Sequence, residues 1–196
     1  MSGVEYYTKD SLQNEIYGKN SKGNEHYISV SDPSKIFAKR ANGEEFYAKQ
    51  RTKEEIYPTI QNKQVVIMKN GSPLYAKNKK GAQKYPKDDQ QNEFYVKDGS
   101  GNFVFAIDRK GKEKYAKNNK GKEFLPAKGV YAKNVEKNNK YPRDENGNSI
   151  YPMNQGVQEY IIEGKKPIFG TDKYNNQFYA KDVGKNDYYP STETLP

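Results

Sequence analysis

The sequence predicts an all-β protein in which short antiparallel β-hairpins follow one another along the chain. Three observations predict it. One large apolar residue recurs at a spacing of ten, a turn signature separates its successive copies, and nearly every unit holds a Gly or Pro that would interrupt a helix. About twenty strand-and-turn units account for nearly all of the 196 residues. They are expected to form an extended spiral, a closed sheet or a solenoid.

The recurring apolar residue is called the anchor below. Fourteen of the twenty anchors are tyrosines, and the others are Phe, Ile or Leu. Successive anchors are ten residues apart, except for two steps of eight and one of six. The anchors are Tyr7, Tyr17, Tyr27, Phe37, Tyr47, Tyr57, Ile67, Tyr75, Tyr85, Tyr95, Phe105, Tyr115, Leu125, Tyr131, Tyr141, Tyr151, Ile161, Phe169, Tyr179 and Tyr189.

The residues around each anchor recur as well. The unit reads E-φ-Y-(A/P)-K-(D/N)-x-x-G-(N/K), where φ is an apolar residue. Five to six extended residues match a typical strand, and D/N-x-x-G matches a type I turn that ends on a left-handed Gly. We therefore expect turns at Asp98–Gly101, Asp108–Gly111 and Asn118–Gly121.

Side chains alternate along a strand, so Glu, the anchor and Lys of one unit are expected to share a face. If neighbouring strands pair anchor to anchor, Glu of one strand lies opposite Lys of the next and tyrosine rings lie side by side. The ladder expected from this register comprises Tyr85, Tyr95, Phe105 and Tyr115, with Glu93 near Lys87 and Glu113 near a neighbouring strand's Lys or polar residue.

Uniform pairing along the whole array is not expected. Each residue of an antiparallel sheet directs its backbone N–H and C=O toward one neighbour only, and six units carry Pro after the anchor. Pairing is therefore expected to alternate in quality, with a hairpin of about twenty residues as the structural unit.

Composition limits the classes of function. Only 33% of residues are hydrophobic and 30% are charged, yet 13% are aromatic, which argues against disorder. The absence of Cys excludes disulfides and thiolate sites, and no apolar run is long enough to span a membrane. The N-terminus lacks an apolar signal-peptide segment, so synthesis in the cytoplasm is expected. The predicted organisation is one repeat domain over 1–190 and a tail over 191–196.

No motif indicates catalysis, a metal or a cofactor. The single histidine, His26, has no second His or Cys with which to form a triad or zinc site. Asp144, Asn146 and Asn148 begin like a calcium loop but lack its later Gly and Glu, so turn chemistry explains them better. Asn70-Gly71-Ser72 is a glycosylation sequon and also a hairpin-turn sequence. The chain is therefore predicted not to be an enzyme.

One surface is open to a binding interpretation. Stacked tyrosines flanked by lysines could hold a polyanion, a single-stranded nucleic acid or a sugar, while the alternative is a solvated face whose Lys are matched by Glu. The net charge of +9 permits a polyanion partner. The candidate face comprises Tyr85, Lys87, Tyr95, Lys97, Tyr115 and Lys117.

The tyrosine-centred units resemble the tyrosine-aspartate (YD, or Rhs-type) repeats of bacterial toxins and cell-surface proteins. That resemblance implies β-hairpins wound into a spiral, although here Ala-Lys or Pro-Lys follows Tyr and the period is shorter. The expected function is structural: a self-assembling scaffold of a fibre, a surface or a virion-type or extracellular assembly, with other copies of the chain as partners. The alternative is a binding module that uses the Tyr/Lys face for a glycan or polyanion.

Overall fold

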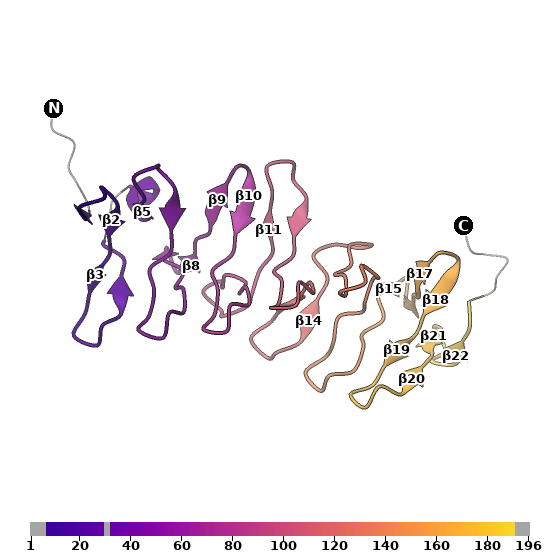
Figure 1. Ribbon diagram of the computed structural model, residues 1–196. Coiled ribbons are helices and arrows are strands. Elements are labelled where there is room, and N and C mark those ends of the chain that lie inside the picture. Colours follow the sequence, from indigo (N-terminus) through magenta and orange to yellow (C-terminus); the bar gives the residue numbers. More distant parts are fainter. Residues whose placement is uncertain (1–6, 30–31, 191–196) are drawn as a thin grey trace. The chain divides into compact units, whose positions relative to one another are not determined.

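The computed structural model describes residues 7–29 and 32–190, and over these residues the protein is all-β (Figure 1). It holds 22 strands of two or three residues and one 3-10 turn, η1 (Pro33–Lys35). The predicted tail, 191–196, lies outside the described residues. The strands are β1 (Thr8–Lys9), β2 (Glu15–Ile16), β3 (Gly18–Lys19), β4 (Glu25–His26), β5 (Ala38–Lys39), β6 (Glu45–Phe46), β7 (Thr59–Ile60), β8 (Lys63–Gln64), β9 (Ile67–Lys69), β10 (Ser72–Leu74), β11 (Val96–Lys97), β12 (Phe103–Val104), β13 (Ala116–Lys117), β14 (Glu123–Phe124), β15 (Met153–Asn154), β16 (Val157–Gln158), β17 (Ile161–Glu163), β18 (Lys166–Ile168), β19 (Gly170–Thr171), β20 (Gln177–Phe178), β21 (Ala180–Lys181) and β22 (Asp187–Tyr188).

Most units form a complete β-hairpin, whereas the described residues between Tyr27 and Phe37 hold the 3-10 turn η1 and no strand pair. The strands pair two by two, always with the next strand along the chain and always antiparallel. In the β5–β6 hairpin Ala38 faces Phe46 and Lys39 faces Glu45, so Glu does lie opposite Lys as predicted. The predicted twenty-residue hairpin is wrong, because two residues on each side of a short turn already use the whole segment between two anchors.

The turns lie where the D/N-x-x-G signature predicts them. Gly101, Gly111 and Gly121 have φ of 84°, 79° and 88°, the left-handed conformation that Gly adopts without steric cost. In the first of these turns the side chain of Asp98 accepts hydrogen bonds from the backbone N–H groups of Ser100 and Asn102, both at 2.9 Å. Asp or Asn thus closes the turn with its own oxygen, as its place in the repeat indicates.

We expect Gly111→Val to lower the free energy of unfolding by about 1–2 kcal/mol, because a side chain is disfavoured in the left-handed region. A Cβ at Gly111 would meet no atom within 4 Å, so the cost would come from the backbone alone. Denaturant unfolding would measure it, with Ser100→Val, an exposed turn substitution, as the control. Equal stability of the two variants would contradict the prediction.

Two pairs of units are nine residues long and correct the position of two anchors. In β9–β10 Ile67 faces Leu74, and in β17–β18 Ile161 faces Ile168. Both isoleucines therefore occupy the position after an anchor, and the anchors are Val66 and Tyr160. The reason lies in the turns, since Asn70 and Gly71 form a two-residue turn with φ of 50° and 77°. Such a turn is one residue shorter and keeps the register, and it confirms that Asn70-Gly71 is a hairpin turn.

The anchors form the core. Consecutive rings meet edge to face, with centroids 5.1 Å apart for Tyr7–Tyr17 and also for Tyr17–Tyr27. In the predicted ladder Tyr85 lies 5.1 Å from Tyr95, which lies 5.5 Å from Phe105. These three rings are adjacent, as predicted. Edge-to-face packing suits the aromatic quadrupole and supplies the large apolar burial that so polar a chain needs.

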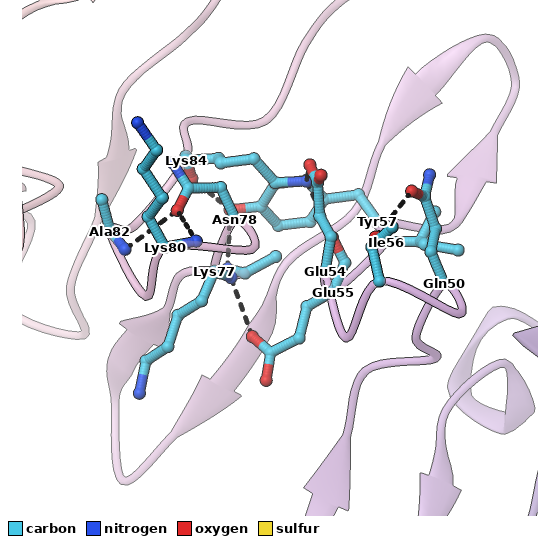
Figure 2. A network of polar contacts seen from close by, with 12 residues as sticks. Gln50, Glu54, Glu55, Ile56, Tyr57, Lys77, Asn78, Lys80, Ala82 and Lys84 are labelled. Atoms are coloured by element: carbon cyan, nitrogen blue, oxygen red, sulfur yellow. Dashed lines mark hydrogen bonds and ion pairs between the residues drawn. The ribbon is translucent and has the colours of Figure 1, made fainter.

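Hydrogen bonds also join hairpins that are three units apart along the chain. The backbone N–H of Glu55 donates to the carbonyl of Lys77 at 2.9 Å, and the carboxylate of Glu55 accepts from the N–H of Lys77 at 2.8 Å (Figure 2). The same two bonds join Glu25 to Lys49, Glu93 to Lys117, Glu113 to Lys133 and Glu123 to Arg143. Hairpins three units apart are therefore stacked neighbours.

The chain divides into two compact units, one comprising Met1–Gln90 and Phe94–Arg109 and the other Gln91–Glu93 and Lys110–Pro196. Both consist of the same hairpins, anchor rings and three-unit bonds. The Glu113 carboxylate accepts from the backbone N–H of Lys133, in the hairpin three units further along the chain, at 2.7 Å. Glu93 bonds in the same way to Lys117, at 2.9 Å.

Candidate functional site

The candidate Tyr/Lys face is divided between the core and the surface. Tyr85 and Tyr115 are buried, with 2% and 1% of their surface exposed, and Tyr95 is half-buried. Lys97 and Lys117 are exposed and Lys87 is half-buried. A ligand here would meet the lysines and not the rings of Tyr85 and Tyr115, because those rings pack against other parts of the protein.

The tyrosine hydroxyls have a defined structural role. In each hairpin the residue after one anchor faces the residue before the next, and we call these two residues the base of the hairpin. The Tyr17 hydroxyl accepts from the N–H of Ala38 at 3.0 Å and donates to the carbonyl of Phe46 at 2.6 Å. Ala38 and Phe46 form the base of one hairpin. The hydroxyl thus replaces a direct backbone bond at that base.

This hydroxyl bridge recurs with one rule. A tyrosine bridges the base of the hairpin that begins two anchors further along the chain. Donor–acceptor distances are 2.7–3.3 Å for N–H to hydroxyl and 2.5–2.8 Å for hydroxyl to carbonyl. Tyrosines with both bonds are Tyr17, Tyr27, Tyr47, Tyr57, Tyr75, Tyr115, Tyr141, Tyr151 and Tyr160.

The bridge explains where proline occurs. Proline has no N–H to donate to a hydroxyl, and it follows the anchor where the anchor two units earlier has no hydroxyl. The five pairs along the sequence are Phe37 with Pro58, Val66 with Pro86, Phe105 with Pro126, Leu125 with Pro142 and Phe169 with Pro190. The exception is Pro152, because the anchor two units before it is Tyr131. The choice between Ala and Pro is therefore a structural signal of the bridge.

Burial of these hydroxyls makes the fold sensitive to alkali. Desolvation raises the pKa of Tyr75 to about 12 and that of Tyr151 to about 12, from an ordinary value of 10.0. The folded state therefore holds the phenol proton more tightly than the unfolded chain does. This stabilisation is complete below the unfolded pKa and is lost as pH rises toward the folded value.

We accordingly expect unfolding in alkali to begin above about pH 10, where a free tyrosine ionises and a phenolate can no longer donate to a carbonyl. Tyrosinate absorbance and circular dichroism followed in one titration would test this. Ionisation of most tyrosines should coincide with loss of the β signal. Full ionisation near pH 10 with the fold intact would contradict it.

The remaining polar candidates serve the fold. The recurring glutamates accept backbone hydrogen bonds, as described above. Asp144 accepts from the N–H groups of Asn146 and Asn148 at 3.0 and 2.7 Å, which confirms turn chemistry there. His26 is exposed and faces Gly18 across β3–β4. Within residues 7–29 and 32–190, no group of three His, Asp or Glu side chains is placed to hold a metal ion.

A basic hollow of about 330 Å³ lies in the second unit. Three cationic side chains and one carboxylate line it: Lys112, Lys140, Arg143 and Glu123. The guanidinium of Arg143 donates to the hydroxyl of Thr171 at 3.2 Å, and the ammonium of Lys140 lies 5.5 Å from the ring centre of Tyr115. The excess of positive charge suits a small anion or one group of a polyanion.

Comparison with known proteins yields no relative. No protein-family model, curated protein or solved structure matches the chain. A search of the described residues finds no helix with the length and apolar character that crossing a membrane requires.

Proposed function

We propose that this chain is a non-enzymatic structural protein, a scaffold that assembles from its own copies into a fibre, a surface layer or a virion-type component. The observation that carries the proposal is the three-unit bonding pattern. Each hairpin is fixed by hairpins close to it in sequence, so the number of repeats sets the length of the array. Repeats of this kind suit a spacer or lattice element.

The use of the polar groups supports a non-enzymatic role. The glutamates, the turn aspartates and most anchor hydroxyls recur from unit to unit and are bonded to backbone groups of the fold. A catalytic group is normally distinguished from its repeats by its surroundings, such as a cleft with a strongly shifted pKa. The recurring carboxylates here have equivalent positions and equivalent partners.

Sedimentation velocity over a wide range of protein concentration, followed by electron microscopy of the largest species, tests the proposal. We expect the sedimentation coefficient to rise with concentration and ordered assemblies to be visible. A single monomeric species at every concentration would overturn self-assembly.

The basic hollow favours a second candidate function, the binding of a sulfated glycan or another polyanion. Its affinity would fall steeply with salt, because lysine and arginine contacts to a polyanion release counterions. Binding of a heparin fragment to the wild type should weaken in a Lys112→Ala/Lys140→Ala variant and not in the turn variant Lys22→Ala. Equal weakening by all lysine substitutions would indicate charge attraction without a site.

A further inference from the structure

The last two anchors of the described residues are unlike the others. Tyr179 and Tyr189 are 49% and 57% exposed, whereas the tyrosines that bridge a hairpin are buried or half-buried. The bridge rule places the partners of these hydroxyls two anchors further on. Within the described part of the chain, neither hydroxyl contacts a hairpin base at that place. The rings and hydroxyl groups of Tyr179 and Tyr189 are thus exposed and can contact another molecule.

The first two hairpins show the complementary feature. The bases of β1–β2 and β3–β4 are formed by Thr8 with Ile16 and by Gly18 with His26. All four residues are exposed, whereas the corresponding Ala38 is 0% exposed and donates its N–H to the Tyr17 hydroxyl. No tyrosine hydroxyl bridges either base within the described residues. Both bases begin with a residue that has a backbone N–H, as a hydroxyl bridge requires.

We propose that copies of the chain associate head to tail through these hydroxyl bridges. Tyr179 of one copy bridges the base of β1–β2 in the next copy, and Tyr189 bridges the base of β3–β4. The register follows from the anchor count. If Tyr7 of the next copy takes the place of the anchor after Tyr189, each tyrosine lies two anchors before its hairpin. The inference rests on the proposed self-assembly and specifies its interface.

The hairpin tips fit the same register. Hairpins three units apart stack, so the β19–β20 hairpin would lie against β1–β2 of the next copy. Tyr174 and Leu12 occupy corresponding turn positions in these two hairpins, and each is 73% exposed. Stacked hairpins already meet at such tips, since a Cβ at Gly71 would lie 3.8 Å from Gly99. The docked copies would therefore remove two isolated apolar side chains from water.

The last two hairpins also carry the side-chain acceptors that join hairpins three units apart. Glu15 and Glu25 use the position two before the anchor to accept a backbone N–H three hairpins on. Gln177 and Asp187 hold this position in the last two hairpins, and both carry a side-chain oxygen. Gln158 shows that an amide serves as well, because its oxygen accepts from the N–H of Lys181 at 2.9 Å.

The test compares removal of the two hydroxyls that bridge a base in the proposed interface with removal of a hydroxyl at a hairpin tip of that interface, which bridges no base. Tyr179→Phe/Tyr189→Phe keeps both rings and deletes both hydroxyls, and Tyr174→Phe deletes an exposed hydroxyl that bridges nothing. Sedimentation equilibrium should show the dissociation constant rising about tenfold for each bridge lost, and little changed in the control. Circular dichroism would verify that every variant is folded.

A second pair of variants tests direction. Thr8→Pro/Gly18→Pro removes the two N–H donors at the other end, at positions where proline already occurs in this repeat. Each double variant alone should associate weakly. A mixture of the two should form dimers and nothing longer, because one variant keeps the two tyrosine hydroxyls and the other keeps the two N–H donors.

The outcomes separate the interface from the function. Assembly that is unaffected by both double variants would overturn the head-to-tail bridges and leave the structural function standing. Absence of association in the wild type at every concentration would overturn self-assembly, and the interface with it.

Discussion

Replacing Tyr75 with alanine is expected to lower the free energy of unfolding by about 3–5 kcal/mol, the usual cost of truncating a large core side chain. Tyr75 is 1% exposed, and its ring lies 5.3 Å from that of Tyr85 in an edge-to-face contact. Its hydroxyl accepts from the N–H of Val96 at 3.3 Å and donates to the carbonyl of Val104 at 2.7 Å. The substitution therefore removes packing and leaves two backbone groups unpaired.

The matched control is Tyr174→Ala. Tyr174 is 73% exposed at a hairpin tip, so its truncation should change stability by less than about 0.5 kcal/mol. Urea unfolding of both variants would measure the difference at unchanged m-value. A loss below about 1 kcal/mol for Tyr75→Ala would mean that the anchor rings are not the source of cohesion.

Local features of the fold could be predicted because they depend on few residues. The turn at Asp98–Gly101 needs only an Asp whose oxygen caps two N–H groups and a Gly that accepts positive φ. The same holds for the neighbouring turns. The pairing of Lys117 with Glu123 across the β13–β14 hairpin follows from the turn length.

The anchor positions in the nine-residue units can be predicted only when the type of turn is known. Counting by apolar character placed anchors at Ile67 and Ile161, whereas the two-residue turns move them to Val66 and Tyr160. The Asn70-Gly71 dipeptide is the strong sequence signal for such a turn. Proline positions carry a second signal, since an anchor at Ile161 would have required proline in place of Ala180.

The exposure of the residues in the candidate binding face could not be derived from strand alternation. Alternation puts Tyr95 and Lys97 on one face of a continuous strand. The anchor instead lies between two hairpins, and the side chain of Tyr95 is half-buried while that of Lys97 is exposed. The stacking of hairpins three units apart could not be predicted either. All units are alike, and a single sequence does not indicate which units contact one another.

The role of the hydroxyl bridge can be measured in a double-mutant cycle at Tyr57 and Ala76. The Tyr57 hydroxyl accepts from the N–H of Ala76 at 3.0 Å. It donates to the carbonyl of Lys84 at 2.5 Å, and both of these residues are labelled in Figure 2. Ala76 is 0% exposed, so water cannot replace the lost partner. Tyr57→Phe should therefore lower the free energy of unfolding by about 1–3 kcal/mol.

Adding Ala76→Pro to Tyr57→Phe should restore about 1 kcal/mol of the free energy of unfolding, because proline has no N–H to leave unpaired. The same Ala76→Pro substitution in the presence of Tyr57 should destabilise, since the hydroxyl then loses its donor. Pro86 follows this pattern two anchors after Val66. It is fully buried, and its carbonyl accepts from the N–H of Phe94 at 3.0 Å.

The control for the cycle is Tyr131→Phe, since Tyr131 lies two anchors before a hairpin whose first residue, Pro152, has no N–H to donate. Tyr131→Phe should lower the free energy of unfolding by less than Tyr57→Phe does, with a difference of about 1 kcal/mol or more. A favourable coupling between Phe at position 57 and Pro at position 76 would establish that the hydroxyl bridge selects Ala or Pro after each anchor. Additive effects of the two substitutions would mean that the matched Phe and Pro positions arose independently of the bridge.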